Sequence, residues 1–173
     1  FTRDEIQKVF SYLEGTSKII CSLLYGSGLR LGEALRLRIK DISFDYNQIT
    51  VRDAKGNKDR ITTLAKSVFP ELKNHLNNVF LIHKSDLKKG KGKTKLPNAL
   101  ALKYPNADRD FYWQYAFPAD KYIKDKDSGL IYRYHIHESS IQRKIKEAIK
   151  QAGILKPASS HTFRHSFATH LLE

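Results

Sequence analysis

Near its carboxyl end the chain carries a histidine and an arginine at a spacing suited to binding an anion. In the segment HTFRH, residues 161–165, His161 and Arg164 are one turn apart on one face of a predicted helix. Ser159 or Ser160 is suited to cap that helix, so the pair lies near a helix amino terminus, where anions are favoured. An imidazole beside a guanidinium fork indicates a phosphate clamp.

The same segment also permits a metal site. His165 follows His161 at the i+4 spacing that metal-binding histidines use, and His170 is nearby. A zinc helix of the usual kind would also carry a glutamate and find a third ligand close by, and this helix has no such glutamate. We therefore expect no metal and no other cofactor, and a metal-binding regulator remains the weaker alternative.

A second arginine lies in YGSGLRLGEALRL, residues 25–37. Gly26 and Gly28 allow a tight turn just before a short helix, and Arg30 then falls in its first turn. The helix dipole repels a cation there, so the arginine makes most sense if an anion docks beside it. Glu33, one turn on, could orient the guanidinium. The alternative is a surface arginine beside a glutamate on the helix face.

A third basic site is AKGNKDR, residues 54–60, which has the composition of a hairpin tip. Lys55 and Lys58 flank Gly56 and Asn57. The turn residues explain the bend but not the lysines. A lysine on a hairpin tip can reach into a site as a proton donor, because a phosphate environment shifts its pKa readily. The alternative is a pair of solvated lysines.

Hydrophobic periodicity predicts mainly helices around a small antiparallel sheet. A capping box of Thr2 and Glu5 opens the first helix, which Gly15 should end. Strands are expected in 42–53 and 58–65, joined as hairpins. Further helices are expected at residues 17–28, 30–38, 70–90, 96–104, 138–153 and 159–173. Residues 90–136 have weak periodicity, many aromatics and dense lysine, so we expect an insertion or a system of loops there.

Charge and cysteine content narrow the class of partner. The 173 residues include 31 Lys and Arg against 18 Asp and Glu, a net charge of +13. Such a balance favours a polyanion, with nucleic acid first and an anionic membrane surface second. The one cysteine, Cys21, excludes a disulfide within the chain and is expected to be buried and reduced in a cytosolic protein. No stretch is apolar for long enough to span a bilayer.

Taken in order, SGLRLGE, AKGNKDR and HTFRH resemble the tyrosine recombinase (phage integrase-like) family over the whole chain. The resemblance implies a mainly helical catalytic core with a small three-stranded antiparallel sheet. It also implies phosphoryl transfer on DNA without a metal. Arg30 and Arg164 match the arginines that grip the scissile phosphate, Lys58 the general acid and His161 the acid–base partner. Glu33 and His165 match supporting residues.

The segments LPNALALKYPNA, WQYAFP and RYHIHE look like those of the integron integrase branch. This likeness implies integration and excision of gene cassettes at double-stranded and folded single-stranded DNA sites with protruding bases. Aromatic side chains on basic loops suit stacking on such bases. We expect Trp113 and Tyr134 to do so, beside Tyr112 and His135, with internal packing as the alternative. Lys55, Lys89 and Lys91 are expected to contact phosphates.

The resemblance also implies what a complete enzyme would carry. The family's nucleophile is a tyrosine beyond the HxxR helix, whereas the last tyrosine here is Tyr134. We therefore expect residues 1–173 to be a partial catalytic domain, without the amino-terminal core-binding domain or the carboxy-terminal tail. It is expected to be a monomer that binds DNA without covalent attachment. The intact enzyme is expected to be a tetramer on DNA, in the bacterial cytoplasm at the nucleoid.

A nucleic-acid-binding module without catalysis is the main alternative. Plain binding needs basic residues but does not require a His–Arg pair matched to a distant arginine. The ordered set of Arg30, Lys58, His161 and Arg164 therefore favours the enzyme.

Overall fold

The computed structural model describes residues 1–54, 56 and 58–173. Its helices are α1 (Arg3–Phe10), α2 (Gly15–Ser27), α3 (Leu31–Leu35), α4 (Phe69–Lys88), α5 (Asn98–Lys103), α6 (Glu138–Gln151) and α7 (Ser160–Leu172). Strands β1 (Ile42–Ser43), β2 (Gln48–Ala54) and β3 (Lys58–Thr63) form one antiparallel sheet in the order β1-β2-β3. Strands β4 (Pro118–Lys124) and β5 (Ile131–His135) form a second. The mainly helical class with a small three-stranded sheet is confirmed.

The predicted helix boundaries are correct at some ends and wrong at others. Thr2 and Glu5 form the capping box of α1. That helix ends at Phe10 rather than at Gly15, and Gly15 instead opens α2 with a left-handed φ of 54°, after Glu14 as its cap. Ser159 caps α7. Arg30 is the capping residue of α3 rather than a residue of its first turn.

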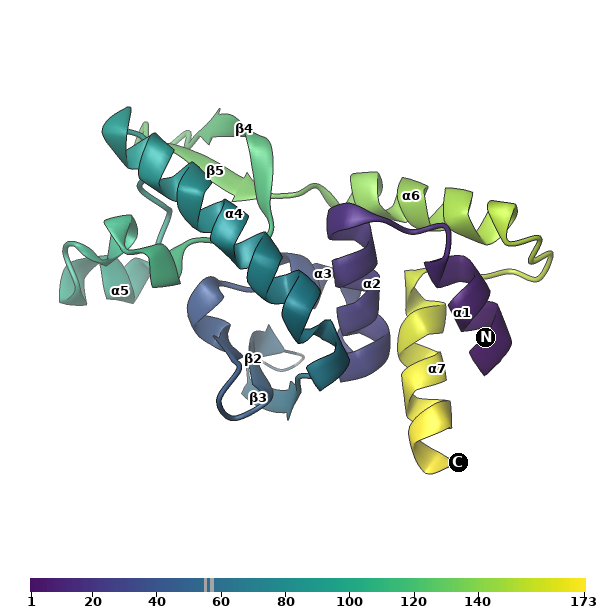
Figure 1. Cartoon of the computed structure of the whole chain (residues 1–173). Helices are drawn as coiled ribbons and strands as arrows, with labels where there is room; N and C mark the ends of the chain where they lie inside the picture. Colours follow the sequence, from purple (N-terminus) through teal and green to yellow (C-terminus); the bar gives the residue numbers. More distant parts are fainter. Residues whose placement is uncertain (55, 57) are drawn as a thin grey trace.

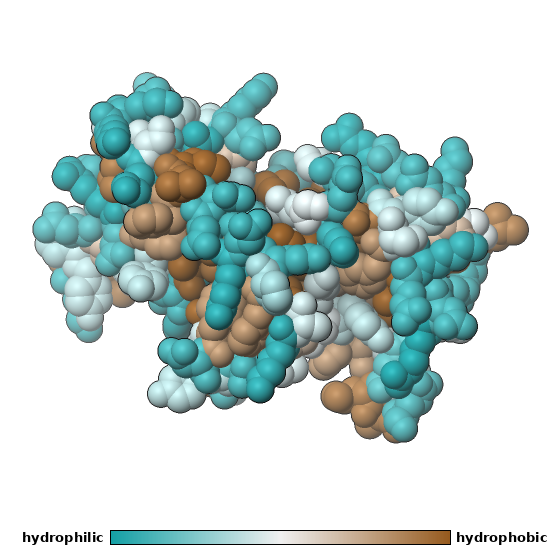
Figure 2. All heavy atoms as spheres, viewed as in Figure 1, coloured by the Kyte–Doolittle hydropathy of each residue, from teal (hydrophilic) through white to brown (hydrophobic). Residues whose placement is uncertain are grey.

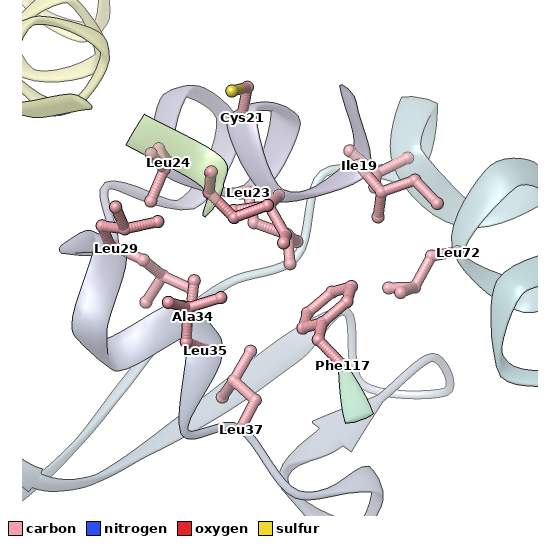
Figure 3. Close-up of a cluster of buried hydrophobic side chains, with 14 of the residues drawn as sticks. Ile19, Cys21, Leu23, Leu24, Leu29, Ala34, Leu35, Leu37, Leu72 and Phe117 are labelled. Atoms are coloured by element: carbon pink, nitrogen blue, oxygen red, sulfur yellow. The ribbon is translucent and has the colours of Figure 1, made fainter. Parts of the chain in front are cut away.

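Helix α2 is the centre of the core, as its apolar sequence predicts. Ile20, Leu23 and Leu24 are fully buried there. In Figure 3, Phe117 points into the cluster between Leu72 of α4 and Leu37 just after α3. The core therefore joins α3, α4 and the segment that leads into β4, and it fixes the position of the short helix that carries Arg30 and Glu33. Hydrophilic atoms cover most of the face drawn in Figure 2.

Residues 90–136 have more regular structure than their weak periodicity predicts. They contain α5 and the β4–β5 hairpin, which lie at the end of α4 remote from α1 and α7 (Figure 1). Arg133 on β5 donates to Asp86 of α4 at 2.6 Å, and the hydroxyl of Tyr122 on β4 donates to the same carboxylate. These long-range charged contacts hold the hairpin, and the local sequence pattern does not encode them.

Gly28 ends α2 at a place where the chain passes close to α7. Its φ is 65°, and an added Cβ would meet the ring of Phe167 at 2.7 Å. Both the backbone conformation and the space therefore require glycine. Because Arg30 follows two residues later, this contact sets the position of Arg30 relative to α7.

We predict that Gly28→Ala lowers the free energy of unfolding by about 1–2 kcal/mol for the left-handed backbone and about 1–3 kcal/mol more for the clash. Gly153 is the matched control, because its φ is 71° and nothing lies within 4 Å of an added Cβ. Gly153→Ala should lower the free energy of unfolding only by the contribution of the left-handed backbone. Urea unfolding measures both variants, and equal losses would show that the Phe167 contact has no effect.

Candidate active site

One buried carboxylate gathers the basic residues of the site. Glu33 on α3 is 5% exposed. Its Oε2 accepts the backbone N–H of Arg30 at 2.8 Å, and its Oε1 accepts Nη1 of the same arginine at 3.0 Å. Nη2 of Arg60 on β3 donates to Oε2 at 2.6 Å. Glu33 therefore closes the first turn of α3 and holds two guanidinium groups at once.

Arg164 on α7 joins this cluster without a hydrogen bond to it. Its Nη1 lies 3.7 Å from Oε2 of Glu33, within ion-pair range but beyond hydrogen-bond range. The same nitrogen is buried and has no partner among the described residues. Burial and the charges of Arg30 and Arg60 lower the pKa of Arg164, and Glu33 opposes them. Arg164 thus presents an unpaired donor from a basic surrounding.

The electrostatics of the cluster favour an added anion. Burial by itself raises the pKa of Glu33, but the Arg30 backbone N–H and the charges of Arg60 and Arg30 together hold it below its ordinary value. Glu33 is therefore ionised at neutral pH, and three guanidinium groups surround its single negative charge. A planar fork such as Arg164 binds phosphate oxygens well.

The structure brings Arg30, Glu33 and Arg164 together from α3 and α7, which lie far apart in sequence. It places His161 differently. His161 is exposed at the start of α7 and lines a recess of about 510 Å³ with Ser139, Arg143 and Lys146 of α6. Among the described residues, no hydrogen bond or ion pair joins His161 to Glu33 or its arginines.

The predicted lysines lie on the β2–β3 hairpin. Lys58 is exposed at the first position of β3, two residues before Arg60. Side chains two apart on a strand share a face of the sheet, so Lys58 projects on the same side as Arg60. Lys55 lies outside the described residues.

The two histidines that follow His161 in the sequence lie at another recess. Both His165, which is exposed, and His170 line it with Phe1 and Lys156, and Glu33 is not among its lining residues. Nδ1 of His170 is hydrogen-bonded to the hydroxyl of Tyr25 at 2.9 Å. Within residues 1–54, 56 and 58–173 no three metal-binding side chains cluster.

Arg60 is the site residue that the sequence reasoning missed. It lies in the same AKGNKDR segment as the two lysines, two positions after Lys58. The alternation of a strand would have placed it on the face of Lys58. What the sequence did not indicate is its partner, because Glu33 is on another element.

The predicted base-binding residues lie within residues 90–136. Trp113 is partly buried, with Nζ of Lys40 4.2 Å from its ring centroid. It lines a recess of about 370 Å³ that also contains Glu33, Arg36 and Tyr115. This recess therefore runs from the buried carboxylate to residues 97–115.

The tyrosine and histidine of RYHIHE lie farther along. Tyr134 is 38% exposed, and its ring packs against those of His135 and Tyr115 with centroids 3.9 and 5.5 Å apart. Tyr112 is also exposed, at 61%. Of the lysines, Nζ of Lys91 lies over the ring of Tyr122, whereas Lys89 is exposed at the end of α4.

Comparison with known proteins gives one consistent family. The sequence matches the family described as "Phage integrase family" over residues 1–173. It is 42% identical to an "Integrase/recombinase" of Escherichia coli over 99% of this chain and 51% of that protein. It is 30% identical to a "Tyrosine recombinase" of Thermosipho africanus, covering 99% of this chain and 47% of that protein. The chain thus spans about half the length of these relatives.

Solved structures give the same result. The fold resembles that of the XerA recombinase with a TM-score of 0.65 and 26% identity, over 99% of this chain and 49% of that one. It also resembles the XerH site-specific recombinase bound to its difH substrate, with a TM-score of 0.59 and 19% identity over 99% and 42% of the two chains. At that identity the second likeness concerns the fold alone.

In the part of the chain that the structure describes, no helix has the length and apolarity to cross a membrane.

We predict that Glu33→Gln destabilises the chain by about 3 kcal/mol at pH 7, because it leaves guanidinium groups around a neutral amide. The folded-state pKa of Glu33 is lowered. Its stabilisation is therefore complete above the unfolded pKa of about 4.3 and is lost as pH falls through the folded value. Urea unfolding from pH 7 to pH 3 should show the difference between wild type and variant shrinking below about pH 4. A difference in stability that stays constant from pH 7 to pH 3 would contradict the claim that ionised Glu33 stabilises the fold.

Proposed function

The chain belongs to the phage integrase family of tyrosine recombinases, and on that premise we propose that it holds the phosphate-binding part of a DNA strand-exchange site. The proposed reaction is site-specific recombination by phosphoryl transfer through a 3′-phosphotyrosine intermediate. The observation that carries the proposal is the unpaired, buried Nη1 of Arg164 beside Glu33 and two further arginines. Such donors stabilise the charge that develops on a phosphoryl group in the transition state.

In the proposed step a tyrosine oxygen forms a bond to phosphorus while the bond from phosphorus to the 5′ oxygen breaks. Arg30 and Arg164 hold the two nonbridging oxygens, and bidentate guanidinium groups fit that geometry. Lys58 gives a proton to the departing 5′ oxygen, and its exposed place at the start of β3 leaves it free to reach DNA. His161, the proposed acid–base partner at the amino terminus of α7, hydrogen-bonds the phosphate and takes the proton that the tyrosine hydroxyl loses. Glu33 orients both arginines.

The active protein is proposed to assemble as a tetramer on DNA, within the compartment that holds the DNA. The basic balance of 31 Lys and Arg against 18 Asp and Glu supports such a partner. Raising the salt concentration should therefore weaken DNA binding steeply.

The activity is tested with the longest polypeptide that the gene encodes and a nicked substrate that traps the covalent intermediate. We predict an adduct that survives a denaturing gel and forms about 10²–10³-fold more slowly in Arg164→Ala and in Arg30→Ala. Lys58→Ala and Lys55→Ala, measured side by side, identify which lysine of the hairpin supplies the proton. Arg3→Ala is the matched control, because Arg3 is an exposed arginine paired with Glu173. DNA binding with no adduct at any site would favour a non-catalytic binding module instead.

Within the family we propose the integron integrase branch, which integrates and excises gene cassettes at folded single-stranded sites. Two observations support this finer proposal. Residues 90–136, the proposed insertion, are rich in basic and aromatic side chains, and Trp113 of this segment lines the same recess as Glu33. Trp113 and Tyr134, with His135 beside them, are proposed to stack on bases that protrude from the hairpin. Lys55, Lys89 and Lys91 are proposed to contact phosphates.

We predict that Trp113→Ala weakens binding to a DNA hairpin with protruding bases by about 1–3 kcal/mol, since one base–aromatic stack is lost. Binding to a perfect duplex of the same length should change little. Gel-shift titration measures both, with Tyr46→Ala as the control because Tyr46 is 77% exposed on the β1–β2 turn. Equal losses on both DNAs would assign Trp113 to packing.

A further inference from the structure

Arg60 shares an acceptor atom with the candidate phosphate-binding arginine. Its Nη2 lies 2.6 Å from Oε2 of Glu33, whereas Nη1 of Arg164 lies 3.7 Å from that same oxygen. The backbone N–H of Arg30 donates to this oxygen as well, at 2.8 Å. Three donors from three elements therefore converge on one oxygen atom.

A carboxylate oxygen has two lone-pair positions for hydrogen bonds. On Oε2 of Glu33 the Arg30 backbone N–H and the Arg60 guanidinium occupy them. Arg164 is held near by charge, yet its Nη1 finds no acceptor and is buried without a partner. A buried donor without a partner is costly, so an incoming anion that accepts from it gains that energy.

We propose that Arg60 is a positioning residue, which by occupying Glu33 keeps the Nη1 donor of Arg164 free for a phosphate oxygen. Without Arg60, Arg164 would close the gap to Oε2 of Glu33 and satisfy itself internally. The proposal deepens the proposed function and rests on it in one respect, that the anion is a DNA phosphodiester.

The strand geometry gives Arg60 a second consequence for the site. Arg60 pairs with Val51 across the sheet, and Lys58 pairs with Ala54. The register shift therefore places the extra residue on β2, and the side chains of β3 keep their regular alternation. Lys58 and Arg60 thus share one face of β3. The bond from Arg60 to Glu33 fixes that face against α3, and it fixes the side from which Lys58 approaches.

A structural ion pair would give different behaviour from a positioning residue. If Arg60 only added charge or stability, its loss would weaken phosphate binding whether or not Arg164 is present. If Arg60 acts through Arg164, the loss of Arg60 weakens phosphate binding only when Arg164 is present. A double-mutant cycle measures this coupling.

The experiment titrates inorganic phosphate, and separately a short duplex DNA, into the 173-residue chain. The variants are Arg60→Met, which keeps the apolar stem of the side chain, Arg164→Ala and the double variant. We expect Arg60→Met to weaken phosphate binding about ten-fold in the wild-type background and less than about two-fold in the Arg164→Ala background. Arg3→Ala, an exposed arginine away from Glu33, is expected to change phosphate binding less than two-fold.

A ten-fold loss from Arg60→Met in both backgrounds, or no loss in either, would overturn the proposal. A second measurement does not depend on the folding of any variant. In the NMR spectrum of the wild-type chain, phosphate should shift the guanidinium N–H signals of Arg164 strongly and those of Arg60 weakly, since the Arg60 donor is already in use. Larger shifts at Arg60, or none at Arg164, would also overturn it.

The phosphate probe keeps this inference separate from the proposed enzymatic activity. Coupling between Arg60 and Arg164 toward phosphate, together with no covalent adduct on DNA, would retain the inference and reject the strand-exchange function. An adduct that depends on Arg164, without that coupling, would retain the strand-exchange function and reject the inference.

Discussion

The site depends on a buried negative charge. Glu33 is an ionised carboxylate at 5% exposure, and such a group is stable only when hydrogen-bonded donors and opposite charges replace its water. Arg30 supplies donors from the same turn and Arg60 from the sheet, and Arg164 adds its charge from α7, so one side chain ties three parts of the fold together. Because one carboxylate cannot neutralise three guanidinium groups, the cluster that it organises keeps a net positive charge, which favours an anion.

Glu33 can pair with Arg164 only if α7 packs at the correct position against the core. Phe163 on α7 is fully buried, and its ring packs edge-on against those of Phe1 and Phe10. On the next turn Phe167 fits against Gly28, where no side chain would fit. Arg164 lies between these two anchors in sequence. The apolar packing therefore sets the Arg164 position, and the ion pair with Glu33 adjusts it.

The sequence was informative where a signal is local. The capping box of α1, the apolar α2 and the cap of α7 follow from residue types within a few positions. Arg30 was predicted because a cation in a first helical turn is unusual, Glu33 because it follows Arg30 by one turn, and Arg164 because it follows His161 by one turn, and the fold brings the three together. Arg60 was missed because its role comes from a partner 27 residues away. His161 matches a motif, yet its surroundings are set by α6, which the motif does not include.

The β4–β5 hairpin was missed for the same reason, because Asp86 of α4 holds it, and other long-range bonds tie residues 95–113 to the end of α3. Arg38, three residues after α3, donates from Nη1 to the carbonyl of Trp113 at 2.6 Å and from Nη2 to that of Lys95 at 2.8 Å. Charge-assisted bonds to carbonyls are strong, so Arg38 holds both Trp113 and Lys95 beside the end of α3. The backbone of residues 37–39 also pairs with the backbone around Tyr115.

Residues 95–113 therefore contact the segment that follows α3 directly. A displacement of Trp113 would pull on Arg38, and through it on the end of α3, only one turn from Glu33. Glu33 and Trp113 also line the same recess at the surface, as this connection requires. A segment with weak local periodicity can thus form a fixed wall of the recess beside Glu33, since long-range hydrogen bonds rather than its own sequence pattern give it structure.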